Sequence, residues 1–214
     1  MYWSSRLQNE RDRLLTKFKP KEILVDAFCG VGPLAIRAAK QQITTYANDL
    51  NPDCYKYLVE NSKVNKVEKY LKAYNMDARE FIRCMIFGSK LIKDDTYNFD
   101  KNFPEDLKIH HIHMNLPKDA IEFLDVFIGL FNNTNKEIYS KDSLPIVHVY
   151  AFSGCLEYKE ETMKKELLDR CAKAMGIEVF PEYCLKGFHN VRDISPRKYV
   201  FCISFMVPSE VAFK

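Results

Sequence analysis

Short apolar runs alternate with segments of helix length over most of the chain, and this alternation restricts the folds that it can adopt. The runs of strand character are 23–28, 44–49, 70–76, 109–115 and 146–152. The segments with apolar side chains at helical spacing are 33–40, 52–64, 78–87, 118–131 and 157–175. Because consecutive parallel strands are joined by helical crossovers, this order predicts a mostly parallel sheet with helices on both faces.

The C-terminal part of the chain departs from this alternation. Two strand-like runs, 178–188 and 198–207, follow one another with a polar turn at 192–197. They predict a terminal antiparallel hairpin, which brings the strands to seven. The sequence therefore predicts an α/β fold with a seven-stranded, mostly parallel, Rossmann-like sheet that ends in a hairpin.

A helical segment precedes the predicted sheet. Apolar positions recur at helical spacing over 7–18, and the outer face of this helix is strongly charged. We expect a helical lead-in over 1–21 and one domain over 22–214. Polar stretches at about 88–108 and 132–143 are expected to be surface insertions.

Charge and hydropathy narrow the possible partners. With 32 Lys and Arg against 29 Asp and Glu, the net charge is only +3, so any contact with nucleic acid is expected to be local. The longest apolar stretch, 123–131, contains Asp125 and is shorter than the roughly 20 residues of a membrane-spanning helix, so no membrane partner is expected. His110, His111 and His113 alternate along a predicted strand, and no metal site is expected there.

The loop at 26–35, Asp-Ala-Phe-Cys-Gly-Val-Gly-Pro-Leu-Ala, follows the first predicted strand and opens a helix. Ligands bind at this position in open α/β sheets. Gly30 and Gly32 allow a tight turn and a close approach to a ligand, and Pro33 suits the first turn of the helix. The string also matches the dinucleotide fingerprint, which is weak evidence alone. A purely structural turn is the remaining alternative.

Acidic residues stand at the ends of the first three predicted strands. Asp26 would repel a pyrophosphate but would pair with an ammonium, whereas Asp49 is placed to accept hydrogen bonds from ribose hydroxyls. Asp77 is placed to bind an adenine amino group. This set favours S-adenosylmethionine, which has an ammonium, a ribose and an adenine but no phosphate. A turn role for Asp49 and a helix-cap role for Asp77 remain open.

Four motifs carry a resemblance to a known family. They are Tyr-Trp-Ser-Ser-Arg-Leu-Gln-Asn-Glu-Arg at 2–11, Asp-Ala-Phe-Cys-Gly-Val-Gly-Pro at 26–33, Asn-Asp-Leu-Asn-Pro at 48–52 and Met-Asn-Leu-Pro at 114–117. The chain resembles the archaeal and eukaryotic tRNA (guanine-N1)-methyltransferases from residue 2 to about residue 207. The resemblance implies a class I methyltransferase fold that transfers a methyl group from S-adenosylmethionine to N1 of guanine 37. It also implies that this chain is a catalytic fragment without the family's N-terminal tRNA-recognition domains.

Methyl transfer to guanine N1 requires a base for the N1 proton and a donor for charge that builds on O6. We expect Glu10 to be the base, with Arg6 one helical turn earlier, and the resemblance places both beside the target base. It assigns Asn115 and Pro117 to the flipped guanine, whose edge suits an amide. Two alternatives stay open on the sequence alone: Glu10 and Arg6 as a surface ion pair of little energetic worth, and 115–117 as an ordinary turn.

The expected site residues form two sets. The expected cofactor contacts are Asp26, Phe28, Gly30, Gly32, Pro33, Asp49, Leu50, Asp77, Ala78 and Asn115. The expected substrate contacts are Tyr2 by stacking, Arg6, Asn115 and Pro117 on the base, and Arg192 and Arg197 on phosphates of the tRNA anticodon arm. Glu10, Arg6 and Asn115 are the expected catalytic residues.

Alternatives of different classes stay open. A wybutosine-pathway transferase would move an aminocarboxypropyl group from the same cofactor onto tRNA, and Glu10 with the 115–117 turn favours methyl transfer over it. An NAD-dependent oxidoreductase and an RNA-binding module without turnover are the others. We expect a monomer in the cytoplasm, with nuclear and mitochondrial pools.

Overall fold

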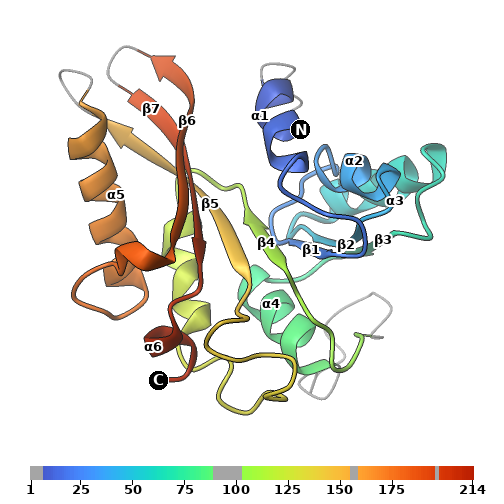
Figure 1. Ribbon diagram of the computed structural model, residues 1–214. Coiled ribbons are helices and arrows are strands. Elements are labelled where there is room, and N and C mark those ends of the chain that lie inside the picture. The colour runs from blue at the N-terminus through green and yellow to red at the C-terminus, as the bar shows by residue number, and fades with distance from the viewer. Residues whose placement is uncertain (1–6, 89–102, 155–158, 196–197) are drawn as a thin grey trace. The chain divides into compact units, whose positions relative to one another are not determined.

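A computed structural model describes residues 7–88, 103–154, 159–195 and 198–214 (Figure 1). The helices are α1 (Gln8–Leu15), α2 (Ala35–Lys40), α3 (Pro52–Val64), α4 (Ala78–Phe87), α5 (Glu160–Ala174) and α6 (Ser209–Ala212), with 3-10 helices η3 (Ala120–Phe127) and η4 (Glu182–Cys184). The strands are β1 (Ile23–Asp26), β2 (Thr44–Asn48), β3 (Leu71–Tyr74), β4 (His111–Met114), β5 (Ile146–Gly154), β6 (Leu185–Ser195) and β7 (Lys198–Met206).

The strands form a seven-stranded sheet in the order β3-β2-β1-β4-β5-β7-β6. β1 pairs in parallel with β2 and β4, and β2 pairs in parallel with β3. β7 pairs antiparallel with β5 and β6. This topology confirms the predicted fold class, including the terminal hairpin.

The chain divides into two compact units, 1–113 and 114–214, and each is described by itself below. The division into a lead-in over 1–21 and a domain over 22–214 stays a prediction. Across the described ranges, no helix combines the length and the apolar character that crossing a bilayer requires.

In the first unit, alternation along the strands sends successive side chains to opposite faces of the sheet. Ala47 and Leu71 pack with residues of α2 and α3 in one buried cluster. Tyr74 lies on the other face, where its ring centroid is 5.3 Å from that of Phe81 on α4 and 4.6 Å from that of Phe103. Helices therefore cover both faces of β1–β3, as expected for a parallel sheet.

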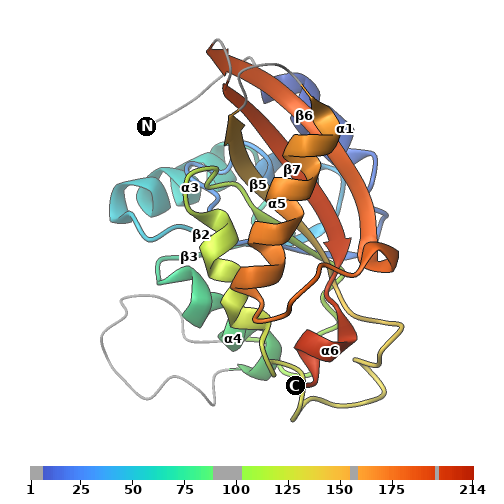
Figure 2. The same cartoon turned by 90° about the vertical axis from the view of Figure 1, so that its left-hand side faces the viewer.

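In the second unit, α5 lies along the β5–β7–β6 strands (Figure 2). Phe180 and Phe205 meet edge to face, with ring centroids 5.2 Å apart. The C-terminal α6 is tied to the segment after η3, because Gly129 N–H donates to Val211 O and Phe131 N–H donates to Ala212 O. These contacts give the second unit its own core around the hairpin.

The first strand of the hairpin was predicted too early. The structure has β6 at Leu185–Ser195 and the 3-10 turn η4 before it, where the sequence predicted a strand over 178–188. Three register shifts interrupt the β6–β7 ladder, between Leu185 and Gly187, Asn190 and Arg192, and Asp193 and Ser195. Bulges therefore accommodate the polar residues Asn190, Arg192 and Asp193 within the strand, whereas composition predicted a turn beginning at 192.

Two further predictions need correction. The segment predicted as a helix over 118–131 contains the shorter 3-10 helix η3, since eight residues are too few for apolar spacing to separate periods of 3.0 and 3.6. The polar stretch 132–143 is not wholly a surface insertion. Tyr139 is buried, with its ring centroid 4.9 Å from that of Phe131.

Stability is expected to fall in mild acid because of a buried histidine. His111 Nε2 lies 3.1 Å from Glu22 Oε2, and its ring packs 4.7 Å from that of Phe18. Burial lowers the pKa of His111 from its ordinary 6.5, although Glu22 opposes the shift. The unfolded chain therefore binds more protons at this site, so its contribution to stability is complete above pH 6.5 and is lost as pH falls.

Urea unfolding between pH 7 and pH 5 measures this effect. We expect His111→Gln to flatten the pH dependence of the unfolding free energy over this range. Equal slopes in wild type and His111→Gln would contradict the assignment.

Candidate functional site

In the loop between β1 and α2, one of the two glycines has free space beside its backbone. Gly30 has φ +57°, and a Cβ added there would meet no atom within 4 Å. Gly32 has φ +86°, and its added Cβ would lie 2.4 Å from Leu58 Cδ1. Gly32 is therefore favoured by its positive φ, and a larger residue there would also displace Leu58 of α3, whereas Gly30 leaves space in which a ligand can approach the main chain. Pro33 is half-buried beside them.

Asp49 ties this loop to the loop after β2. Its Oδ2 accepts a hydrogen bond from Gly30 N–H at 2.8 Å, and its Oδ1 accepts one from Asn51 N–H at 2.9 Å. Asn51 in turn caps α3 by accepting from Asp53 N–H. The turn role left open for Asp49 is thus present. It is compatible with ligand binding, because each carboxylate oxygen can accept more than one hydrogen bond.

Asp26 is almost fully buried, with 1% of its surface exposed. Its Oδ1 lies 2.8 Å from His113 Nδ1. The two residues are in register on the neighbouring parallel strands β1 and β4. Sequence analysis missed this partner, which the register between β1 and β4 determines. The contact of Asp26 with a ligand ammonium stays a prediction.

The two carboxylates place negative charge around the loop after β1. Burial, followed by the charges of Asp26 and Asp49, raises the pKa of the Cys29 thiol well above its usual range. Burial, followed by the charge of Asp49, also raises the pKa of Cys54. Negative charge therefore acts on the Cys29 thiol of this loop and on the Cys54 thiol in the first turn of α3. Such a field favours a cation and disfavours a pyrophosphate.

The loop after β3 shows the cap role left open for Asp77. Asp77 Oδ1 accepts hydrogen bonds from Arg79 N–H at 2.8 Å and Glu80 N–H at 3.3 Å, so it caps α4. Leu50, an expected cofactor contact, is 68% exposed. The other two expected contacts in this unit differ in exposure, since Phe28 is half-buried and Ala78 is buried. Any contact of Asp77 with adenine stays a prediction.

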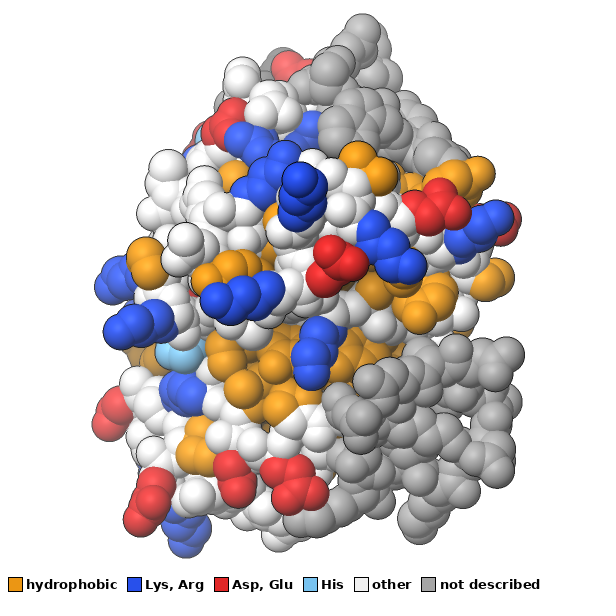
Figure 3. Space-filling view, turned by 90° about the vertical axis from the view of Figure 1, so that its right-hand side faces the viewer, with side chains coloured by type: hydrophobic (Ala, Val, Ile, Leu, Met, Phe, Trp, Pro, Cys, Tyr) orange, Lys and Arg blue, Asp and Glu red, His pale blue; other side chains and the backbone are white. Residues whose placement is uncertain are grey.

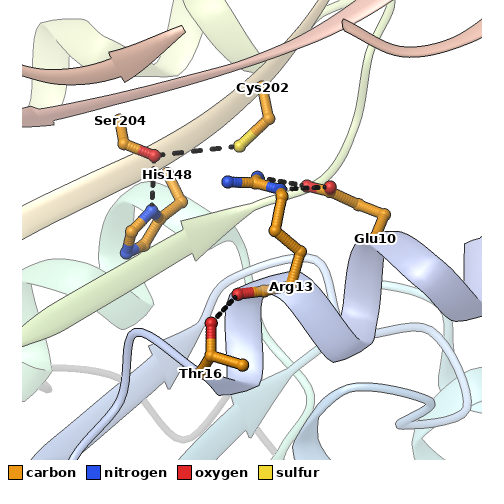
Figure 4. Close-up of polar contacts among 6 residues, drawn as sticks. All are labelled: Glu10, Arg13, Thr16, His148, Cys202 and Ser204. Carbon is orange, nitrogen blue, oxygen red and sulfur yellow. Dashed lines mark hydrogen bonds and ion pairs between the residues drawn. The ribbon is translucent and has the colours of Figure 1, made fainter. Parts of the chain in front are cut away.

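Glu10 lies on α1 and is only 6% exposed (Figure 4). Its carboxylate accepts two hydrogen bonds from one guanidinium, from Arg13 Nε at 2.7 Å and from Arg13 Nη2 at 2.6 Å. The expected neighbour Arg6 lies outside the described residues, as does Tyr2. Arg13 was not singled out from the sequence, although its spacing of three residues from Glu10 is a signal for such a pair.

Four expected substrate residues belong to the second unit, and the structure describes three of them. Asn115 and Pro117 follow β4 and are half-buried. Ala120 N–H donates to Leu116 O at 2.7 Å, and Phe152 N–H donates to Pro117 O at 3.1 Å, so backbone bonds hold this turn against β5. Arg192 is half-buried on β6, and Arg197 lies outside the described residues. On the face in Figure 3, Lys and Arg side chains are interspersed with acidic and apolar ones.

The remaining histidines have separate partners. His110 Nδ1 accepts from Ile23 N–H at 3.1 Å, whereas His111 and His113 contact different carboxylates. Within the part of the chain that the structure describes, no group of three His, Cys, Asp or Glu is placed to hold a metal ion. In the second unit, His148 Nδ1 lies 2.8 Å from Ser204 Oγ, in a buried polar pair between β5 and β7 (Figure 4). Sequence analysis missed that pair.

Comparisons with known proteins identify the relatives of this chain. Residues 1–97 match the family model of the TRM5/TYW2 methyltransferase domain. A tRNA (guanine(37)-N(1))-methyltransferase of Candida albicans is 42% identical over 242 residues, covering 100% of this chain and 54% of the relative. This chain is a relative of the tRNA (guanine(37)-N(1))-methyltransferases. The resemblance found in its motifs is thereby confirmed.

A second sequence and a crystal structure show the same similarity. The methyltransferase of the same name from Phytophthora infestans is 41% identical, and the match covers 100% of this chain and 44% of the relative. The crystal structure of wild-type Trm5b from Pyrococcus abyssi superposes with a TM-score of 0.65 at 27% identity, over 97% of this chain and 50% of that one. The chain thus spans about half the length of the methyltransferases that it matches, and it has their fold.

Proposed function

We propose that this chain binds S-adenosylmethionine and transfers its methyl group to N1 of guanine 37 of tRNA. The observation that carries the proposal is the acidic loop cluster of the first unit, in which Asp49 binds Gly30 N–H and the charges of Asp26 and Asp49 act on Cys29. Relatives that match the whole chain have the corresponding name. Together these findings favour a cationic cofactor at the carboxyl ends of β1 and β2.

The residues present fit that cofactor. Asp26 would face its ammonium, Asp49 its ribose hydroxyls and Asp77 its adenine amino group. The open space at Gly30 admits the cofactor close to the backbone of the loop. The exposed side chain of Leu50 would pack on part of the adenine, because this contact removes apolar surface from water. When bound, the cofactor would supply an electrophilic methyl group on a positively charged sulfur.

Glu10 is the proposed base for the guanine N1 proton. Its carboxylate is held in one orientation by two charge-assisted hydrogen bonds from Arg13. The bonded carboxylate oxygens retain lone pairs for that proton. Asn115 would bind the guanine edge through its amide, and Pro117 would pack against the base. Arg6 would stabilise charge on O6.

Anticodon-arm contacts complete the proposal. Arg192 and Arg197, near the β6–β7 turn, would bind phosphates, and Tyr2 would stack on the target base. The protein would act as a monomer in the cytoplasm, with nuclear and mitochondrial pools.

The closest alternative is the aminocarboxypropyl transfer of the wybutosine pathway. The matching family model covers both TRM5 and TYW2 domains, so it does not separate the two reactions. The relatives that match over the whole chain are named for methyl transfer, which favours that reaction. The negative charges of Asp26 and Asp49 at the loop disfavour an NAD-dependent oxidoreductase, because they would repel the pyrophosphate of the dinucleotide.

Two measurements test the proposal. In calorimetry, S-adenosylmethionine should bind and NAD should not. Mass spectrometry of tRNA digests, after incubation with an unmodified tRNA transcript, should show a guanine heavier by one methyl group at position 37. Binding of NAD alone would overturn the cofactor assignment, and an aminocarboxypropyl adduct would overturn the reaction.

A further inference from the structure

Asn48, the last residue of β2, has a fully buried side chain at the edge where the ligand loops begin. β2 is the middle strand of the β3-β2-β1 part of the sheet. The parallel ladder to β1 ends at the pair Asp26 and Ala47, and the ladder to β3 ends at the pair Asn48 and Tyr74. Beyond these pairs, the three strands lead into separate loops, with Asp26 at the end of β1 and Asp49 and Asp77 in the loops after β2 and β3.

The side-chain amide of Asn48 links the segment after β1 to the segment after β3. Its Nδ2 donates to Ala27 O at 3.2 Å and to Met76 O at 2.9 Å. Its Oδ1 accepts from Met76 N–H at 3.0 Å. The side chain thus binds both the N–H and the C=O of Met76, as a backbone partner in a strand would.

These contacts connect the three proposed cofactor carboxylates. Ala27 follows Asp26 in the chain, Met76 precedes Asp77, and Asn48 itself precedes Asp49. The Asn48 main chain adds one more link, because its carbonyl accepts from Cys29 N–H at 2.8 Å. One buried side chain therefore lies at the junction of all three loops.

We propose that Asn48 is a positioning residue of the cofactor site, which holds the three loops at the separation that S-adenosylmethionine needs. This inference rests on the proposed function. Asn48 does not touch the cofactor; it acts through the main chain of Ala27 and Met76, which are buried like Asn48 itself. A buried amide of this kind is costly to leave unpaired, so the loops are held together as long as the side chain is present.

The test compares Asn48→Ala with a matched variant of the same strand. Thr45 is fully buried on β2 and donates its Oγ1 hydrogen bond to Ile43 O, away from the loops. Both Asn48→Ala and Thr45→Val remove a buried polar contact, so both are expected to lower the melting temperature. Calorimetry with S-adenosylmethionine is done at a temperature at which circular dichroism shows both variants folded.

We expect Asn48→Ala to weaken binding of S-adenosylmethionine by about tenfold or more, and Thr45→Val to leave the affinity near that of wild type. Asn48→Ser, whose hydroxyl is too short to reach both neighbours, should show the same loss and serves if Asn48→Ala does not fold. An unchanged affinity in a folded Asn48 variant, or an equal loss in Thr45→Val, would overturn the inference. Failure of the wild type itself to bind the cofactor would instead overturn the proposed function.

Discussion

Replacing Glu10 by Gln should lower methyl transfer by about 10²- to 10⁴-fold, the range for loss of a general base. Glutamine has the shape of glutamate and can still accept a hydrogen bond from Arg13, but it cannot take up the guanine N1 proton at neutral pH. Affinity for S-adenosylmethionine should change little, because the loops proposed to bind the cofactor follow β1, β2 and β3, not α1. Single-turnover transfer to tRNA measures the effect.

Glu22→Gln is a suitable control for this variant. Glu22 also belongs to the first unit and is partly buried, but its carboxylate contacts His111, not Arg13. The control should keep the rate of transfer. If Glu10→Gln transfers methyl groups at the wild-type single-turnover rate, Glu10 is not the base, whatever the cofactor affinity shows.

The sheet was predictable from the sequence because each βα unit carries its own local signal. The apolar run at 23–28 and the glycines that follow it predict both β1 and the open loop where Gly30 now leaves space. Carboxylates at strand ends were equally visible, since parallel strands bring their carboxyl ends to one edge. What such reasoning cannot supply is the partner of each carboxylate.

Arg13 and His113 illustrate this limit. Arg6 and Arg13 lie four residues before and three residues after Glu10, and spacing alone does not choose between them. The partner of Asp26 comes from β4, 87 residues away in the chain, and it is determined by the register between two parallel strands. Register depends on packing of the whole sheet, which a local pattern does not contain.

The hairpin shows a second kind of limit. Its existence followed from two consecutive strand-like runs, but its first strand begins seven residues later than predicted at 178, at Leu185. The bulges of β6 place Asn190 and Asp193 inside a strand, where an alternating pattern does not expect them. Composition therefore predicted a turn at the point where the ladder with β7 continues.

Asp49→Asn should weaken S-adenosylmethionine binding more than any other change among the loop carboxylates. The substitution removes the charged carboxylate that would accept hydrogen bonds from the ribose hydroxyls. In the wild type, Gly30 N–H and Asn51 N–H each donate to one oxygen of this carboxylate. In the variant, an NH₂ group, which cannot accept, would face one of these two donors. Hydrogen bonds to charged groups contribute about 1.5–3 kcal/mol, so the affinity should fall by about 10- to 150-fold. Calorimetry measures it.

Asp53→Asn separates this specific effect from a general loss of negative charge. Asp53 lies four residues later at the start of α3, is exposed, and also acts on the Cys54 thiol. If the field alone attracted the cationic cofactor, both variants would lose affinity alike. If Asp49 binds the ribose, Asp53→Asn should bind S-adenosylmethionine nearly as well as wild type, and only Asp49→Asn should also lose affinity for free adenosine, which carries the ribose but no charge.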